Sequence, residues 1–462
     1  MPHTVDEYKK LFKAHESTLL DEYFAFLRFR SISADPVHLH DLQACAQWLE
    51  LLLSESGLDV ELWDKDKAPI VFASDMRAGP EQPTLLLYNH YDVQPVDPLA
   101  LWHHDPFSPK KEGNLIYARG AQDNKGQCFY VLSALRLYLQ LNKKFPINIK
   151  WIIEGEEESG SSGLYNILKE KKEALQCSSL LIVDLGMRKP HLPSITLGTR
   201  GLTSLDIEVQ GTQGDLHSGM HGGVAYNPLH ALVELLASLR DSRGRIQVPG
   251  FYDDVASLKA EELAHINLNF DEVEYEEQFG EEPTGGEKSF SPIERLWLRP
   301  TVEINGLSGG YQGPGGKTVI PSKAMAKISC RLVPHQDPQK IASLLSNYFK
   351  SMAPRGTSVT VTVHEGMGKP VRTSANSKVA KALETALKEV FWQQPEYILE
   401  GASIPIVSAF AESFDAEIGL FGLGLPSDNI HAPNECFGWD RIEKGFLTIC
   451  RTIDTLATSN SR

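Results

Sequence analysis

The sequence predicts an α/β fold in which a larger domain is interrupted by an inserted α+β domain. The chain has 462 residues, and at roughly 100 to 200 residues per domain this length suits two or three domains. Short apolar runs alternate with helical periodicity near both ends, which predicts a mostly parallel sheet with helices on both faces. In the middle, apolar and polar residues alternate, as in strands with one buried face. We therefore expect the larger domain at residues 1–200 and 372–462, and the inserted domain at 201–371.

The larger domain is expected to alternate strands and helices. Its first part begins with helices within residues 19–56, where apolar residues recur at helical spacing until Gly57. Short apolar runs then predict strands at residues 69–73, 84–88, 147–153 and 180–183, with helices at 126–141 and 164–175. The second part is predicted as a helix at 379–391, strands at 404–410 and 418–422, and a closing helix at 441–456.

The inserted domain is expected to follow the order β-α-β-β-α-β, which matches the ferredoxin-like unit. Its elements are predicted at residues 205–209, 228–239, 302–304, 326–333, 339–352 and 359–363. Residues 253–282 lie between its first helix and second strand and hold eleven acidic residues, with Lys259 as the only lysine or arginine. We interpret this segment as a solvated surface or mobile loop and assign it no function.

Composition and charge exclude several classes of protein. Apolar residues make up 42% of the chain and charged residues 23%, as in ordinary folded, soluble proteins. The net charge of -15 argues against nucleic acid as a partner, because phosphate binding needs clustered lysine and arginine. The first residues lack a signal-peptide pattern, and no stretch reaches the ~20 apolar residues of a spanning helix. We therefore expect a cytoplasmic protein without a membrane partner, with its six scattered cysteines reduced.

Acidic residues and histidines gather where predicted strands end or a helix begins. The clusters are His90 with Asp92, Asp123, the three glutamates at 156–158, and Asp184. Open α/β sheets place their binding crevice at the carboxyl ends of the strands, so these side chains are expected to converge. Taken singly, each has an ordinary structural explanation. Together, two imidazoles and three to four carboxylates without cysteine suit two zinc, manganese or cobalt ions, because buried carboxylates need a compensating cation.

Segments over nearly the whole chain resemble the signature elements of a family of di-metal zinc hydrolases, and they occur in the same order. This family includes carnosinases, cytosolic non-specific dipeptidases, aminoacylases, succinyl-diaminopimelate desuccinylase and glutamate carboxypeptidase. The matching segments are residues 89–95 (NHYDVQP), 119–126 (RGAQDNKG), 154–161 (EGEEESGS), Asp184, 215–219 (DLHSG) and His431. The sequence is most similar to the dipeptidase and carnosinase branch, through residues 93–95, 317–321 and 331–334. This resemblance implies the same fold, with the inserted domain serving as a lid and dimerisation domain.

The resemblance also implies a set of metal ligands. His90 and Asp184 would bind one ion, and Glu158 and His431 the other. Asp123 would bridge the two. Two divalent ions per subunit are implied, with zinc as the expected metal and manganese or cobalt as alternatives.

Further roles follow from the same resemblance. Asp92 would orient His90. Glu157 would act as general base, taking a proton from a water that bridges the metals and passing it to the leaving amine. His217 would reach across a homodimer interface and stabilise the oxyanion. The substrate-binding residues would be Arg331, which would hold a terminal carboxylate, together with Thr318, Glu400, Gly401 and Ser403.

The predicted function is therefore hydrolysis of the peptide bond of dipeptides by a metallo-dipeptidase. Deacylation of N-acyl amino acids is an alternative on the same site, since both reactions break an amide beside a free carboxylate. A metal-binding but inactive scaffold is an alternative of another class. It would predict missing ligands, whereas all five ligands and Glu157 are present.

Three further features test this interpretation. Asn124 stands where many relatives have a second aspartate, and the resemblance implies a cis bond between Asp123 and Asn124. His364 is out of register with the substrate-binding histidine of carnosinase-like relatives, so its contact with substrate stays open. Residues 306–310 match the G-x-S-x-G motif of serine hydrolases, but the residues after them cannot begin the helix that this motif requires.

Overall fold

The computed structural model describes residues 3–64, 67–256, 260–364 and 366–459. The chain forms two compact units: Met1–Leu197 with Thr373–Ile398 and Ala409–Arg462, and Gly198–Arg372 with Leu399–Ser408. Among the described residues, no helix has the length and apolar character needed to cross a membrane.

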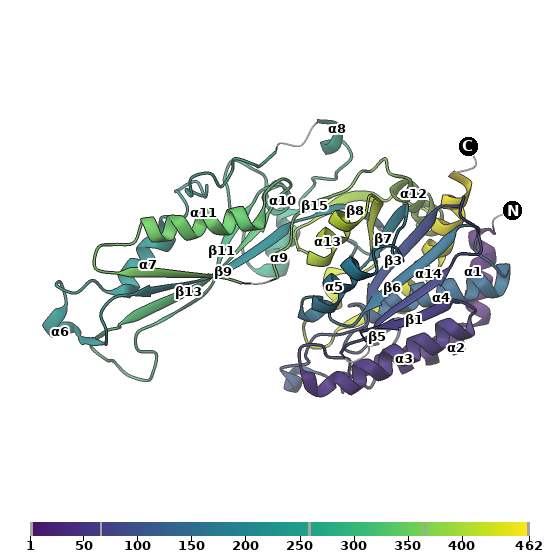
Figure 1. Cartoon of the computed structure of the whole chain (residues 1–462), viewed down its shortest axis with the longest axis horizontal. Coiled ribbons are helices and arrows are strands. Elements are labelled where there is room, and N and C mark those ends of the chain that lie inside the picture. Colours follow the sequence, from purple (N-terminus) through teal and green to yellow (C-terminus); the bar gives the residue numbers. More distant parts are fainter. Residues whose placement is uncertain (1–2, 65–66, 257–259, 365, 460–462) are drawn as a thin grey trace. The chain divides into compact units, whose positions relative to one another are not determined.

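Most of a nine-stranded mixed sheet lies in the first unit (Figure 1), in the order β1-β2-β6-β3-β7-β17-β8-β15, with β16 beside β8. Its strands are β1 (Asp59–Trp63), β2 (Ile70–Asp75), β3 (Thr84–His90), β6 (Asn148–Glu154), β7 (Ser179–Val183), β8 (Ser194–Thr199), β15 (Val371–Arg372), β16 (Glu396–Glu400) and β17 (Glu417–Phe421). The exceptions are β15 and the last two residues of β8 and of β16, which belong to the second unit. The central strands β6, β3, β7 and β17 pair in parallel, whereas β1, β2 and β15 pair antiparallel at the edges. The predicted α/β class is confirmed. The antiparallel edges make the sheet mixed.

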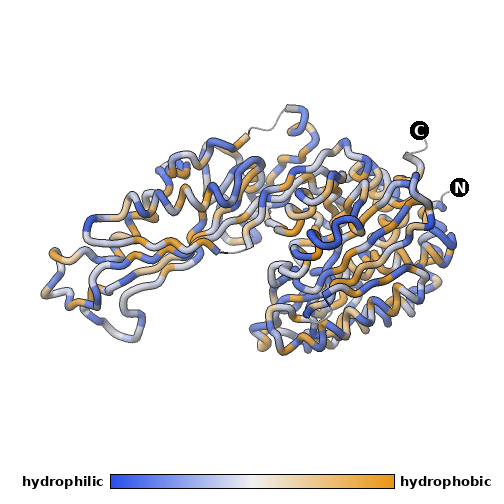
Figure 2. The backbone as a smooth tube through the Cα atoms, viewed as in Figure 1, coloured by the Kyte–Doolittle hydropathy of each residue, from blue (hydrophilic) through white to orange (hydrophobic). Residues whose placement is uncertain are grey.

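The central strands β6 and β7 are buried along their whole length because both of their faces are covered. Tyr88 of β3 meets the ring of Phe410 in α13 (Pro405–Ser413), whereas the next residue, Asn89, bonds Asn124 at the start of α4 (Lys125–Asn142). Successive strand residues point to opposite faces, so α13 and α4 cover opposite faces of the sheet. Figure 2 shows hydrophobic segments alternating with hydrophilic ones along the backbone, in helices as well as in strands.

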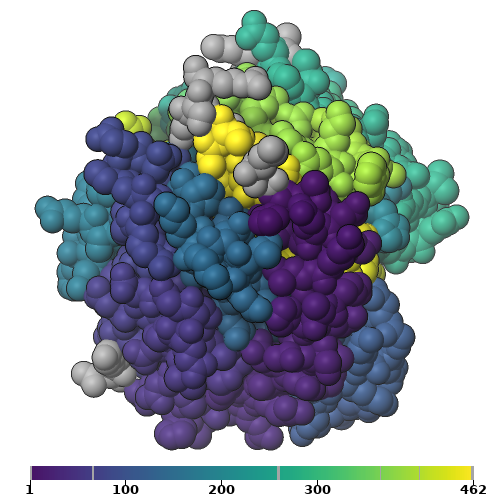
Figure 3. Space-filling model, turned by 90° about the vertical axis from the view of Figure 1, so that its right-hand side faces the viewer, coloured from purple at the N-terminus to yellow at the C-terminus, as the bar shows by residue number. Residues whose placement is uncertain are grey.

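The remaining helices of the first unit are α1 (Val5–Ala14), α2 (Glu16–Leu27), α3 (Leu39–Glu55), α5 (Ser162–Glu170), α12 (Lys378–Phe391) and α14 (Trp439–Ser459). The two ends of the chain pack against each other. Phe12 of α1 contacts the rings of Trp439 and Phe446 in α14. Figure 3 shows this face, with purple N-terminal residues beside yellow C-terminal ones.

One predicted element of this region is wrong. Residues 404–410 were expected to form a strand, but they lie mostly in helix α13, and the strand is β16 just before it. A short apolar run fits either a buried strand or a buried helix. Pro405 stands at the first helical position, where a proline needs no amide hydrogen and favours a helix start.

The second unit contains a four-stranded antiparallel sheet in the order β11-β13-β9-β14. Its chain order is β9 (Gly201–Gln210), α7 (Pro228–Ala237), β11 (Thr301–Gly309), β13 (Lys323–Leu332), α11 (Pro338–Ser351) and β14 (Ser358–Val363). This is the predicted β-α-β-β-α-β order. Every second residue of β9 is buried, and Leu205, Ile207 and Val209 form a core with residues of α7 and α11.

The acidic segment of the second unit contains two short helices. These are α8 (Ala260–Leu263) and α9 (Glu272–Phe279), and α9 has no buried residue. Lys259 lies outside the described residues. The exposure of α9 agrees with the expectation of a solvated surface.

Candidate metal centre

Three parallel strands bring ligand-type side chains to one edge of the sheet. His90 is the last residue of β3, and Asp184 follows β7. Glu157 and Glu158 lie in the short 3-10 helix Glu157–Ser159, which follows β6. Because β6, β3 and β7 are parallel neighbours, their carboxyl ends meet at this edge.

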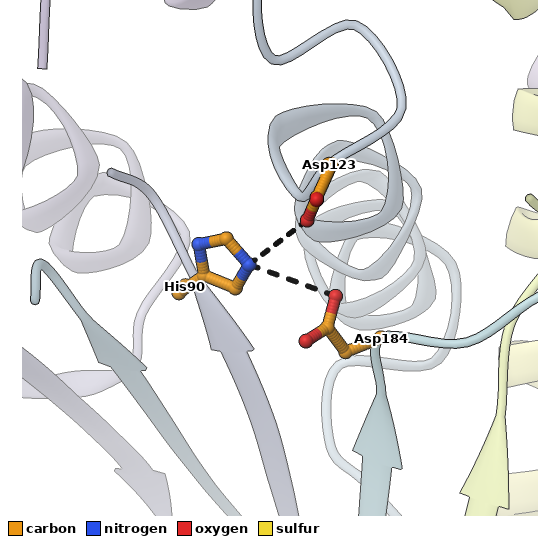
Figure 4. A group of neighbouring side chains, drawn as sticks. All are labelled: His90, Asp123 and Asp184. Atoms are coloured by element: carbon orange, nitrogen blue, oxygen red, sulfur yellow. Dashed lines mark hydrogen bonds and ion pairs between the residues drawn. The ribbon is translucent and has the colours of Figure 1, made fainter. Parts of the chain in front are cut away.

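The first group of possible ligands is His90, Asp123 and Asp184. His90 is fully buried. Its Nε2 lies 3.2 Å from Asp123 Oδ1 and 3.6 Å from Asp184 Oδ1. Figure 4 shows both carboxylates pointing at this nitrogen, Asp123 from the loop before α4 and Asp184 from the end of β7.

The second group is Asp123, Glu158 and His431. His431 Nε2 lies 2.9 Å from Asp123 Oδ2 and 3.4 Å from Glu158 Oε2. Asp123 thus presents one oxygen to His90 and the other to His431. In each group the ligand atoms lie within 4.8 Å of one another, so the structure contains two adjacent ligand sets that share one carboxylate.

Asp92 connects His90 with the glutamate segment. Its carboxylate lies 3.2 Å from His90 Nδ1 and accepts hydrogen bonds from the backbone amides of Glu157 and Glu158. Ser33 donates a further bond of 2.6 Å to it. A carboxylate on the second imidazole nitrogen fixes the tautomer and orientation of a ligand histidine. Asp92 is therefore placed to hold His90 with Nε2 turned to Asp123.

Two asparagines hold the loop that carries Asp123. The Asp123–Asn124 bond is cis, as predicted. Asn124 donates a bond of 2.6 Å to Asp184 Oδ1 and accepts one of 2.7 Å from Asn89. The asparagine that departs from many relatives thus orients a neighbouring carboxylate.

The electrostatics of the site show an excess of crowded carboxylates. Burial and the Asp123 charge raise the pKa of Glu158 to about 7. Burial, reinforced by the neighbouring carboxylates, raises the pKa of Glu157 well above its ordinary value, and burial also raises the pKa of Asp184. Hydrogen bonds to Asp123 and Glu158 raise the pKa of His431 to about 10. Protons are therefore held where a cation would otherwise neutralise the charge.

The donor set fits two divalent ions. It consists of imidazole nitrogens and carboxylate oxygens without a thiolate, a combination that suits zinc, manganese or cobalt. Glu158 Oε1 is buried and has no hydrogen-bond partner among the described residues, as expected for a ligand atom without its metal.

The predicted substrate residues lie in the second unit. Arg331 of β13 is partly buried and donates a bond of 2.9 Å to Ser403 Oγ. Glu400 accepts a bond from the amide of Ala402. Gly401 offers its carbonyl to Arg200, whose buried Nη1 has no partner among the described residues.

His217 and Thr318 are neighbours in the second unit. His217 lies in β10 (Leu216–His217), which pairs with β12 (Val319–Ile320). The carbonyl of Thr318 accepts a bond of 3.0 Å from the amide of Ser218, directly after His217. Both residues have exposed side chains. His217 Nδ1 accepts a hydrogen bond of 3.0 Å from the amide of Gly219.

Two uncertain motifs have structural explanations. His364 directly follows β14 and bonds Asp206 of the neighbouring strand β9 at 2.7 Å. Residues 306–310 lie in and directly after strand β11, and no helix follows before β12. The serine-hydrolase motif is therefore a coincidence.

Several positioning residues were missed from the sequence. Gln94 donates a bond of 2.7 Å to Glu158 Oε2, and Asn89 supports Asn124. Asn89 and Gln94 lie in the same short segment as His90, residues 89–95, and this proximity is their only sequence signal. Glu435 and Arg200 had no such signal, because their partners are far away in the chain.

A model of the peptidase family M20/M25/M40 matches residues 86–455. The chain belongs to this peptidase family. Beta-Ala-His dipeptidase of Homo sapiens is 33% identical over 381 residues, covering 81% of this chain and 75% of that protein. Cys-Gly metallodipeptidase dug1 of Schizosaccharomyces pombe is 31% identical over 417 residues, covering 87% and 84%. The crystal structure of the M20 family metallo-carboxypeptidase Sso-CP2 from Sulfolobus solfataricus has a TM-score of 0.85 and 32% identity, and covers 95% of this chain and 99% of that one.

These similarities confirm the predicted family. The two relatives named above are dipeptidases, and the dug1 protein is a metallodipeptidase, as the resemblance implied. The M20 family protein YXEP of Bacillus subtilis, whose solved structure is 12% identical with a TM-score of 0.59, is described as a dinuclear metal binding peptidase. The present chain has two ligand groups that share Asp123.

Proposed function

We propose that this M20 peptidase hydrolyses the peptide bond of dipeptides with two divalent metal ions. The observation that carries the proposal is the pair of ligand groups sharing Asp123, with Glu157 beside them. His90 and Asp184 would hold one ion, Glu158 and His431 the other, with zinc as the proposed metal. Two such ions lower the pKa of water and polarise a substrate carbonyl.

Glu157 is the proposed general base. It takes a proton from the attacking water and delivers it to the leaving amine nitrogen. Asp92 supports both parts of the site, because its carboxylate bonds the amide of Glu157 and the ring of His90.

Arg331 is proposed to bind the free carboxylate of the dipeptide. A guanidinium can donate two parallel hydrogen bonds to a carboxylate. Ser403, which accepts a bond from Arg331, would keep the guanidinium in place. Thr318, Glu400 and Gly401 are proposed as further contacts with the substrate.

We further propose a homodimer formed through the second unit. Val233 of α7 and Leu307 of β11 are each 57% exposed, and Ile304 is 41% exposed. They line a hollow of about 380 Å³, and β11 stands at the end of its sheet. An exposed apolar face beside an edge strand favours pairing with a second copy. His217 would then stabilise the oxyanion in the site of the other subunit.

A cytoplasmic location and the domain limits 1–200 with 372–462 and 201–371 stay predictions of the sequence.

A substrate panel tests the proposed activity. Metal-stripped protein is assayed with dipeptides, the same dipeptides as carboxyl-terminal amides, and N-acyl amino acids, before and after adding zinc, manganese or cobalt. We expect metal-restored cleavage of dipeptides and a strong preference over their amides. Cleavage of N-acyl amino acids alone would assign the chain to deacylation. Two bound metals with no cleavage of any substrate would contradict the proposal.

Mixed dimers test the role of His217. After subunit exchange, His217→Ala and Glu157→Gln subunits should together recover activity that neither has alone, because one site of the mixed dimer keeps both groups. No recovery despite confirmed exchange would contradict action across the dimer.

A further inference from the structure

A single buried side chain joins the two loops that carry Asp123 and His431. Glu435 lies four residues after His431, directly before strand β18 (Cys436–Gly438). Strand β18 pairs with β5 (Leu115–Tyr117), and this pairing brings Glu435 beside residues 118–123. Glu435 is fully buried.

Glu435 accepts hydrogen bonds from nearly the whole loop before Asp123. One carboxylate oxygen accepts the amide of Gly120 at 2.8 Å and the Arg119 guanidinium at 2.8 Å. The other accepts the amides of Gln122 at 2.9 Å and Asp123 at 3.0 Å. Its backbone carbonyl also accepts the amide of Ala118.

The conformation of the loop agrees with this arrangement. Gly120 has a φ of 81°, and a Cβ there would lie 2.5 Å from Val93 Cγ1, so only glycine is accommodated. Arg119, which is 1% exposed, also bonds the carbonyl of Pro95 and lies over the ring of Trp102. The loop therefore directs its amides toward one point, and Glu435 occupies that point.

We propose that Glu435 is a positioning residue for the two-metal centre, holding the backbone of Asp123 so that one carboxylate oxygen serves each metal. The inference rests on the proposed two-metal function. The His90 half has its own supports in Asp92 and Asn124. Glu435 is therefore most important for the half that Asp123 shares with His431, and its loss should weaken the second metal more than the first.

The test compares Glu435→Gln with wild type and with Asp454→Asn. Asp454 is the matched control: it is buried and accepts bonds from Tyr8, Tyr138 and Arg451, but it lies in α14, outside the ligand-bearing segments. Stripped proteins are titrated with cobalt by calorimetry and absorption spectroscopy, and wild type must first bind two equivalents. If it does not, the two-metal proposal fails independently of Glu435.

In Glu435→Gln, the side-chain NH2 group would replace one carboxylate oxygen. It would face backbone amides, which are donors themselves and would lose their acceptor. We expect the second equivalent to bind about 10- to 100-fold more weakly, as for other residues that orient ligands, with the first changed less. At limiting metal, kcat should fall while KM stays within about twofold, because the substrate contacts are untouched. Asp454→Asn should lower thermal stability and leave both metal affinities unchanged. Wild-type affinity for the second metal in Glu435→Gln would overturn the proposal.

A second measurement needs no variant and covers the case in which Glu435→Gln does not fold. In metal-stripped wild type, the amides of Gly120, Gln122 and Asp123 should exchange hydrogen as slowly as in the metal-loaded protein, because Glu435 holds them without metal. Fast exchange that becomes slow only on metal addition would show that the metals order the loop, and would overturn the proposal.

Discussion

The two halves of the metal centre share Asp123 but are built differently. The His90 side chain is 1% exposed, sits at the end of a central strand and is held at Nδ1 by Asp92. The His431 side chain is 53% exposed and projects from a loop residue with a φ of 58°. One half is therefore fixed by the sheet, and the other depends on loop contacts.

This difference indicates that the two halves bind their metal ions with unequal affinity. A ligand with its tautomer and rotamer already held loses less conformational freedom when a metal binds. The buried His90 half should therefore bind metal more tightly. The His431 half is more open to solvent, so its metal should exchange more readily.

The largest effect is expected from Glu157→Gln, which separates metal binding from chemistry in both halves. The variant keeps the shape of the side chain but removes the base, so kcat should fall by about 100- to 10,000-fold. Both metals should remain bound, because Glu157 belongs to neither ligand group. Steady-state kinetics and metal analysis of the same sample check this. A wild-type rate would remove Glu157 from the role of base.

Replacing each histidine tests the difference between the halves directly. His431→Ala should bind one cobalt ion with nearly wild-type affinity and lose the second. His90→Ala should lose the tighter ion, with an affinity drop of at least about 100-fold, since a ligand matters more than a residue that orients it. Stoichiometric titration distinguishes the two variants. If both lose the same ion to the same degree, the halves are not distinct.

The sequence was most informative for the buried half, and the reason is physical. His90 ends an apolar strand, and Asp92 and Asp184 follow such strands. The end of a parallel strand is where α/β sheets place functional groups. Their mutual positions follow once the strands are known. Asp123 and the glutamates at 156–158 were singled out in the same way, because they directly precede a helix or follow a strand. The choice of Glu158 among these glutamates, and the assignment of His431, came from the family resemblance.

Features that depend on distant pairing could not be predicted. Glu435 meets Arg119 across more than 300 positions, and only the β18–β5 pairing brings them together. The antiparallel edges of the sheet are equally hidden, since an apolar run such as β2 does not specify the direction of its neighbour. Residues 404–410 were expected to form a strand because a short apolar run fits either a buried strand or a buried helix. Local apolar pattern and long-range contact are separate sources of information, and the sequence shows only the first.

A smaller effect is expected from Asp92→Asn, which removes the support that distinguishes the His90 half. The two carboxylate oxygens of Asp92 face the backbone amides of Glu157 and Glu158 and the ring of His90. Asparagine keeps only one of these oxygens as an acceptor. Affinity for the tighter metal should fall about 10- to 100-fold. Ser33→Ala is the matched control, because it removes one bond to Asp92 and leaves the others. An equal loss in both variants would mean that Asp92 acts only through local packing.

The smallest step, measured per pH unit, concerns protons, and both halves should contribute. Burial lowers the pKa of His90, but the Asp184 charge and hydrogen bonds to carboxylates outweigh it and raise that pKa well above its ordinary value. Without metal, His431 has a pKa of about 10 and Glu158 a pKa of about 7, so at pH 7 the former is protonated and the latter partly so. A metal binds only the deprotonated groups, so its binding releases these protons. As the pH is raised, affinity for the second ion should therefore increase by up to about tenfold per pH unit for each proton released. The increase should level off once the pH exceeds the pKa values of these groups. Calorimetry in buffers of different ionisation enthalpy measures the release, which should fall by about one proton in His431→Ala. Binding heats that do not depend on the buffer at pH 7 would show that neither group holds a proton before the metal arrives.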